Sequence, residues 1–168
     1  MLGRALTLGA SLALLAIVAW NLSLRSGAVP LNLAHEIVSD HIRSLLANHL
    51  VDVNSADSHT VRSWFSGKLD YAVSVGDFAG DGFTLAGGRL DYVDGHPVAA
   101  LVYRRDAHVI NIFAWPTRED DAAMPEPRWT DDHGYHLAEW SNAGITHWAI
   151  SDADSSELKQ LTRLLGAK

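Results

Sequence analysis

The chain has 168 residues, of which 48% are hydrophobic and 20% charged, with six tryptophans and no cysteine. This composition is typical of a globular protein, and the lack of cysteine excludes disulfides, cysteine-ligated zinc and thiol catalysis. Residues 1–25 hold two of the 13 basic residues and no acidic one, so the other 143 residues hold 11 basic and 20 acidic side chains, a net charge of −9. Such an acidic surface repels phosphate backbones, and no direct nucleic-acid partner is expected.

Residues 5–24 form one apolar segment that is long enough to cross a membrane. Twenty helical residues cover about 30 Å, the thickness of the hydrocarbon core. This length favours an uncleaved anchor over a cleaved signal peptide, whose apolar region spans about 7–15 residues. We therefore expect a transmembrane anchor over 1–25, a linker over 26–32 and an extracytoplasmic domain over 33–168. The predicted location is the bacterial inner membrane, single-pass, with the bulk of the chain in the periplasm.

Apolar residues at helical spacing predict a helix over 33–50, with Asn32 as its N-cap. A short helix capped by Asp57 or Ser58 is expected over 60–65, and a final helix over 155–165. The strands expected in chain order cover residues 69–73, 89–93, 98–104, 108–115, 134–140 and 145–151.

Short connections between these strands require antiparallel pairing. We therefore expect an α+β fold: one transmembrane helix, then a single antiparallel sheet of about five strands packed by an N-terminal and a C-terminal helix. The strands over 98–104 and 108–115 are nearly continuous apolar runs, which predicts central strands covered on both faces. Residues 117–132 are acidic and contain prolines, and we expect them to form a mobile loop.

Two histidines form the weak candidate for a metal site. His133 and His136 lie beside Asp131 and Asp132, and His35 and His41 could approach them in space. Imidazole and carboxylate groups suit several divalent metals. Two histidines at this spacing do not converge at a loop-to-strand junction as they would on a helix, so exposed loop histidines are the simpler interpretation. No metal or other cofactor is expected.

The motifs of hydrolases, zinc proteases and phosphate-binding loops are absent from the sequence. Gly87-Gly88-Arg89 precedes an expected strand, not a helix, so it is no dinucleotide fingerprint. The chain is therefore not expected to be an enzyme. A hydrolase that uses residues 117–132 as a lid is a weaker alternative.

The segment over 57–68 combines a histidine, two aromatic residues and two cations without simple periodicity. Trp64 and Phe65 either pin this segment to the sheet or anchor a partner, since buried aromatic residues dominate interfaces. His108 and Asn111 point to opposite faces of one expected strand. The candidate partner surface comprises His59, Arg62, Trp64, Lys68, Arg89, His108 and Asn111.

Several of these runs resemble one known family. DSHTVRSWFSGKL at 57–69, GGRLDY at 87–92, VAALVYRR at 98–105 and HVINIF at 108–113 are similar to the extracytoplasmic domain of bacterial transmembrane anti-sigma factors. The resemblance covers about residues 33–166. It differs at Arg62-Ser63, where the family usually has Lys-Pro.

The resemblance implies a membrane-anchored, non-enzymatic regulatory or sensor domain that relays an envelope signal through protein partners, in signal transduction and transcription regulation. Family members carry a cytoplasmic N-terminal domain, often a zinc module, that grips the sigma factor. Only three residues precede Arg4 here. We therefore expect this half to be missing, and a sigma factor to be a partner only if it is supplied. The alternative is a periplasmic ligand- or metal-binding module unrelated to transcription.

Overall fold

The computed structural model describes residues 31–46, 49–118 and 123–166. Leu31–Lys168 forms one compact unit. Its elements in chain order are α2 (Leu31–Leu46), β1 (Val53–Asn54), α3 (Ser58–Ser66), a 3₁₀ turn (Ala79–Asp81), β2 (Thr84–Val93), β3 (His96–Arg105), β4 (His108–Pro116), β5 (Arg128–Asp132), β6 (Tyr135–Asn142), β7 (Ile145–Ser151) and α4 (Ser155–Gly166).

The strands form one seven-stranded sheet in the order β1-β2-β3-β4-β7-β6-β5. Every neighbouring pair is antiparallel. Strand β4 is therefore the middle strand of the sheet, with β3 beside it. Both strands are buried along most of their length, as their continuous apolar sequences predicted.

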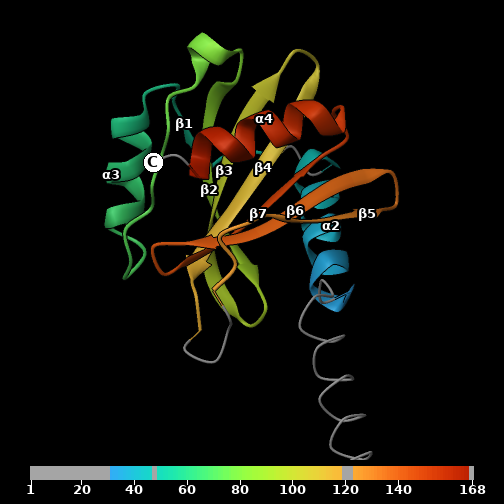
Figure 1. Cartoon of the computed structure of the whole chain (residues 1–168). Helices are drawn as coiled ribbons and strands as arrows, with labels where there is room; N and C mark the ends of the chain where they lie inside the picture. Colours follow the sequence, from blue (N-terminus) through green and yellow to red (C-terminus); the bar gives the residue numbers. More distant parts are fainter. Residues whose placement is uncertain (1–30, 47–48, 119–122, 167–168) are drawn as a thin grey trace, which may run out of the picture. The chain divides into compact units, whose positions relative to one another are not determined.

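Helices α3 and α4 pack on one face of the sheet, which we call the α3/α4 face; α4 crosses in front of the strands in Figure 1. Alternate residues of a strand point to opposite faces, so Leu101 of β3 and Ile112 of β4, which are register partners, share this face. They belong to one buried hydrophobic cluster with Phe65 of α3 and Leu161 of α4. This cluster is the main core.

Helix α2 packs on the other face, which we call the α2 face, where it contacts β7, β2 and β5. The strand residues on this face lie one position away from those of the main core. Val102, Phe113 and Ile150 are fully buried there. The sheet is therefore covered on both sides, by two helices on one face and by α2 on the other.

The predicted count of about five strands is wrong, because the sheet has seven. Strand β1 has only two residues, too few for a periodic pattern. Strand β5 lies inside the stretch 117–132 that was predicted to be a loop. It is a partly exposed edge strand whose sequence RWTDD lacks the apolar alternation of a buried strand.

The strand predicted over 69–73 is also wrong, because this segment pairs with no other strand of the described part. Its alternating apolar residues pack on the main core without joining the sheet. The Tyr71 hydroxyl accepts a hydrogen bond from the Ala99 amide (3.1 Å) and donates one to the Ala114 carbonyl (2.8 Å). Ala99 and Ala114 are the last register partners of β3 and β4, so Tyr71 closes the end of this ladder.

No helix in residues 31–46, 49–118 and 123–166 is both long enough and apolar enough to cross a membrane. This finding overturns two predictions: the transmembrane helix in the fold class and the single-pass location in the inner membrane. Both depended on residues 5–24, which lie outside the described residues.

Candidate functional site

Helix α2 buries a stripe of residues that is apolar in its first half and polar in its second. The buried residues in order are Ala34, Ile37, Val38, Asp40, His41 and Ser44. Opposite the polar half, β2 contributes a buried Arg89 and β4 a buried Asn111. We call Asp40, His41 and Ser44 of α2, together with Arg89, Asp91 and Asn111 of the sheet, the polar seam.

The charged members of the polar seam are paired. Asp40 accepts a hydrogen bond from Arg43, one turn along α2. Arg89 donates through Nε to Asp91 Oδ2 (3.0 Å) and through Nη1 to the Leu50 carbonyl (3.3 Å). The Arg89 side chain is only 2% exposed. A buried arginine needs such partners, because a buried charge without compensation is costly.

Several polar atoms of the polar seam lack a complete set of hydrogen bonds. The Asn111 side-chain amide lies 3.5 Å from Ser44 Oγ, at the limit of a hydrogen bond. Asp40 Oδ2, Asn111 Oδ1 and both ring nitrogens of His41 are buried and have no hydrogen-bond partner among the described residues. Buried polar groups normally have hydrogen-bond partners. Helix α2 therefore packs on a polar layer in which several buried atoms lack such partners.

Burial changes the ionisation of two seam residues. Desolvation raises the pKa of Asp40 to about 6, and the nearby Asp91 carboxylate adds to this shift. Desolvation lowers the pKa of His41 to about 4, and the Arg89 guanidinium adds to that shift. Near neutral pH, His41 is therefore uncharged and Asp40 carries its charge in an unfavourable environment.

A pocket of about 100 Å³ opens beside the polar seam. It is lined by Asp40, Arg43, Ser44, His49, Arg89, Leu90 and Asp91. Its walls carry acidic and basic groups together, so it offers no single charge to an ionic ligand.

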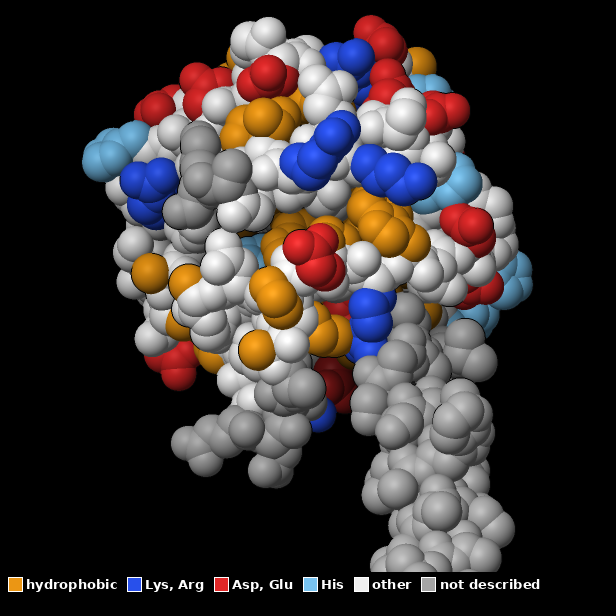
Figure 2. Space-filling view, viewed as in Figure 1, with side chains coloured by type: hydrophobic (Ala, Val, Ile, Leu, Met, Phe, Trp, Pro, Cys, Tyr) orange, Lys and Arg blue, Asp and Glu red, His pale blue; other side chains and the backbone are white. Residues whose placement is uncertain are grey.

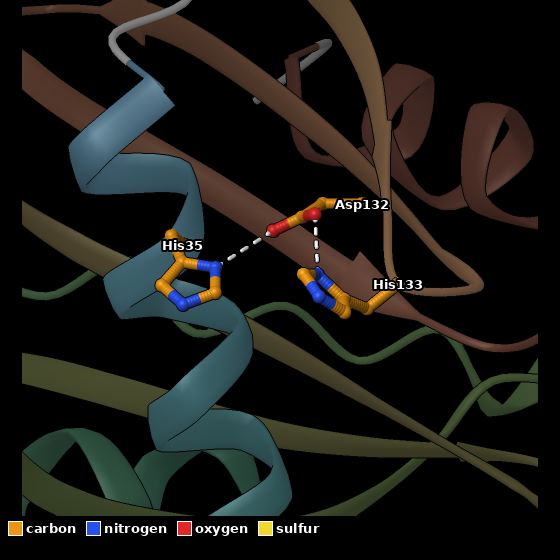
Figure 3. Close-up of side chains that lie close together, drawn as sticks. All are labelled: His35, Asp132 and His133. Atoms are coloured by element: carbon orange, nitrogen blue, oxygen red, sulfur yellow. Dashed lines mark hydrogen bonds and ion pairs between the residues drawn. The ribbon is translucent and has the colours of Figure 1, made fainter.

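A second polar cluster joins α2 to the turn between β5 and β6. His35, Asp132 and His133 each place one ligand atom within 4.8 Å of the others. His35 Nδ1 lies 3.3 Å from Asp132 Oδ2, and His133 Nδ1 lies 2.5 Å from Asp132 Oδ1. Figure 3 shows the carboxylate between the two imidazole rings. This is a set of nitrogen and oxygen donors that suits a divalent metal ion.

The environment of this second cluster is open and acidic. Figure 2 shows histidine and acidic side chains together at the edge of the molecule where α2 and the β5–β6 turn lie in Figure 1. Desolvation would raise the pKa of Asp132, but hydrogen bonds from His133 and His35 outweigh it and hold that pKa below its usual range. Asp132 is therefore a carboxylate at neutral pH.

Of the predicted metal pair, His133 and His136, the structure brings only His133 into a cluster with another predicted residue, His35. His35 joins His133 in the cluster, whereas His136 lies one strand position away from the α2 face and contacts Asp131 (2.5 Å). His41 packs edge-on against Tyr135, with ring centroids 5.1 Å apart. His136 and His41 are outside the three-residue cluster.

Four residues of the candidate partner surface lie on or next to α3. Asp57 caps this helix by accepting bonds from the His59 and Thr60 amides, which confirms one of the two predicted caps. His59 is exposed, and Arg62 donates to the Val75 carbonyl (3.0 Å). The Lys68 ammonium lies 4.7 Å from the ring centroid of Trp64, which is half-buried against the core.

The other three residues of the candidate partner surface lie elsewhere. Arg89 and Asn111 are buried under α2 as members of the polar seam. His108 pairs with Asp152 through a 3.0 Å contact at the start of β4, and this hydrogen bond raises its pKa. The seven predicted residues therefore do not form one continuous surface.

The burial of Asp40 and His41 in α2 was not predicted from the sequence. Asp40 looks like a member of the exposed face of α2, yet it is buried. His41 follows Ala34, Ile37 and Val38 at helical spacing, so its position on the buried stripe is a signal that the periodicity contained. The sequence suggested that His35 could approach the region of Asp132, 97 positions away, but no sequence pattern indicated a direct contact between them.

Comparisons of the chain with protein-family models, with curated proteins and with solved structures find no match. The resemblance to the extracytoplasmic domain of anti-sigma factors therefore stays a prediction from the sequence.

Proposed function

We propose that the Leu31–Lys168 unit is a non-enzymatic regulatory domain of the anti-sigma-factor type, which senses a signal and passes it to protein partners that act on transcription. The sequence resemblance over about residues 33–166 is the first support. The second is structural, and it concerns α2, the first described element of the unit.

The polar seam is the observation that carries this proposal. A regulatory domain needs an element with two states of similar free energy. Each buried polar group that lacks a hydrogen bond costs about 1–3 kcal/mol, and Asp40, His41 and Asn111 all have such atoms. Undocking of α2 would hydrate these atoms and recover part of this cost. Helix α2 is therefore the element that a partner or a ligand can release with least work.

The surroundings of the histidines support a role other than catalysis. The hydrogen bonds of His35, His49, His108, His133 and His136 go to aspartate carboxylates. A histidine that activates a nucleophile bonds to a serine, threonine or cysteine besides any aspartate, and none of these five rings has such a bond among the described residues. The net charge of −9 in residues 26–168 favours protein partners over nucleic acid. A sigma factor is a partner only where a sigma-binding domain is supplied.

The test is transcript sequencing in the cell that encodes this chain. We expect deletion of the gene to change a defined set of transcripts, and the wild-type chain to restore them. Asp40→Asn removes the buried charge and should hold α2 on the sheet more firmly, so it should restore basal levels but weaken the response to stress. Ser39→Ala, on the exposed side of the same helix, is the matched control. Unchanged transcripts after deletion, with and without stress, would contradict the proposal.

A ligand- or metal-binding module unrelated to transcription is the second candidate. The observation in its favour is the arrangement of His35, Asp132 and His133. A metal that copurifies with the chain, together with transcripts that do not respond to deletion, would favour it over the regulatory domain.

A further inference from the structure

We propose that His35, Asp132 and His133 bind one divalent transition-metal ion of the zinc type, and that this ion fastens α2 to the β5–β6 turn. The proposal stands on the geometry of this cluster. It does not depend on the regulatory role proposed above, because a metal can hold α2 in place whether or not α2 transmits a signal.

His133 occupies an unusual position in the β5–β6 turn. His133 and Gly134 are the two central residues of the β5–β6 hairpin, since Asp132 and Tyr135 are register partners. Both have positive φ, 50° and 85°, as a type I′ turn requires. Glycine, asparagine and aspartate are the usual residues in such turns. Here the first position is a histidine whose imidazole is 64% exposed and directed at Asp132.

The two histidines reach one carboxylate from different elements of the fold. The His35 ring approaches from α2 and the His133 ring from the hairpin, with centroids 5.3 Å apart. In Figure 3 both rings point toward Asp132. A salt bridge needs only one of them, and the exposed His35 gains little from a surface contact at 3.3 Å. Two imidazoles around one carboxylate are more economically explained as ligands.

The distances allow a metal ion to enter. Zinc bonds of about 2.0–2.2 Å place tetrahedral ligand atoms roughly 3.2–3.6 Å apart. The three donors already lie within 4.8 Å of one another, so small rotations of exposed side chains reach this spacing by opening the 2.5 Å contact between His133 and Asp132 and closing the wider separations. Water would complete the coordination, because His35 and His133 are 63% and 64% exposed. The net charge of −7 of the chain draws cations to its surface.

A metal ion bound at this cluster would link α2 to the β5–β6 turn of the sheet. Beyond this cluster, α2 is held partly by a seam with unsatisfied groups. An ion bound at His35 and at the hairpin adds a contact that α2 loses when it undocks, and therefore shifts α2 toward the docked state.

The test titrates the metal-stripped full-length chain, without a histidine tag, with ZnCl₂ by calorimetry. We expect one saturable site, and MgCl₂ should not compete because magnesium prefers oxygen ligands. His35→Ala and His133→Asn should each weaken zinc binding at least about tenfold. Asparagine tolerates positive φ, so the second variant keeps the turn. His136→Ala, on the neighbouring strand but facing away from the cluster, is the matched control and should bind as the wild type does.

A second readout separates a structural metal from a loose surface contact. Zinc should slow hydrogen exchange of α2 amides in the wild type and in His136→Ala, but not in His35→Ala or His133→Asn. Circular dichroism checks that each variant is folded. The proposal is overturned if zinc does not saturate, if the two ligand variants bind with wild-type affinity, or if only His136→Ala loses binding.

Discussion

The α3/α4 face buries aliphatic and aromatic side chains in one cluster, whereas the α2 face buries Arg89, Asn111 and Glu139 among its apolar residues. Glu139 is paired with Arg128 at 2.6 Å. Both faces belong to the same strands and differ by one residue position. The α3/α4 face therefore supplies most of the stability of the sheet, whereas the α2 face buries polar groups that reduce it.

Most of the orphaned atoms follow the same division. Asp40, His41, Asn111 and Trp148 on or against the α2 face have buried polar atoms without a hydrogen-bond partner among the described residues, whereas His147 Nδ1 is such an atom on the α3/α4 face, where His147 pairs with Trp140. We therefore expect α3 and α4 to remain docked under conditions in which α2 opens.

Phe65→Ala tests the α3/α4 face. Phe65 is fully buried in the main core, and a Cβ built on Gly88 would lie 2.8 Å from its ring. Loss of this ring should lower the free energy of unfolding by about 3–5 kcal/mol, measured by urea denaturation. Ser63→Ala, exposed on the same helix, should change it by less than about 0.5 kcal/mol. A loss below about 1 kcal/mol for Phe65→Ala would mean that this face is not the main source of stability.

The pKa of Asp40 predicts how the α2 face responds to pH. It is raised from 3.8 to about 6, by desolvation and then by Asp91, with Glu36 adding and Arg43 opposing. The folded chain therefore binds this proton more tightly than the unfolded chain does. Its contribution to stability is present at about pH 4 and is lost as the pH rises through about 6, by up to about 3 kcal/mol.

His41 acts in the opposite direction. Its pKa is lowered from 6.5 to about 4 by desolvation and then by Arg89, with Asp152 opposing. The unfolded chain binds this proton more tightly, so stability is present above about pH 6.5 and is lost as the pH falls toward about 4. The loss is again up to about 3 kcal/mol. The two residues should therefore largely cancel between about pH 4 and 6.

Two variants separate these effects. Relative to the wild type, Asp40→Asn should lose stability as the pH falls from about 6 to 4, because only the His41 effect remains. His41→Gln should gain stability over the same range. The measurement is the urea midpoint at pH 4, 5, 6 and 7. Parallel curves for all three proteins would show that neither residue is buried as described.

Asp57→Ala measures how much the N-cap of α3 contributes to stability. Asp57 accepts bonds from the His59 and Thr60 amides, both at 3.1 Å. Loss of such an N-cap costs about 1 kcal/mol, which should appear in urea denaturation. Ser55→Ala, which removes only the hydroxyl that the Asp57 amide contacts, should cost less. An effect as large as that of Phe65→Ala would mean that the cap, and not the core, holds α3.

Asn111→Leu should have the smallest effect on stability. Asn111 is fully buried on the α2 face, and its carbonyl oxygen has no partner among the described residues. Leucine has a similar volume, and replacement of an unsatisfied polar group by an apolar one is nearly neutral or stabilising. We expect a change of less than about 1 kcal/mol in the same urea assay. A loss of several kcal/mol would show that the polar seam is well satisfied.

Much of the sheet was predictable from the sequence, because β3 and β4 are nearly continuous apolar runs and β6 and β7 flank a short turn that contains Gly144. Other features were not, and the reasons are physical. Leu69, Tyr71 and Val73 alternate like a strand because they pack on the core, while the hydroxyl of Tyr71, and not its backbone, joins the sheet. Strand β5 was missed because an exposed edge strand does not need an apolar pattern.

The candidate site was also predicted only in part from the sequence. The sequence pointed to His133 and suggested that His35 could approach it, but the hairpin geometry decides that Asp132 and His133 face α2 while His136 faces away. The strand period separates residues that are close in sequence. The polar seam was hidden because Asp40 reads as an exposed residue of an amphipathic helix, and only tertiary packing buries it.

Hydrogen exchange followed by mass spectrometry tests most directly whether α2 is the less firmly held helix. The full-length chain is exchanged at pH 7, without metal and at rising concentrations of urea below the unfolding midpoint. We predict that α2 amides exchange through a local opening of lower free energy than those of α3 and α4, and that this difference persists until global unfolding. Equal protection of all three helices at every urea concentration would contradict this account of the two faces.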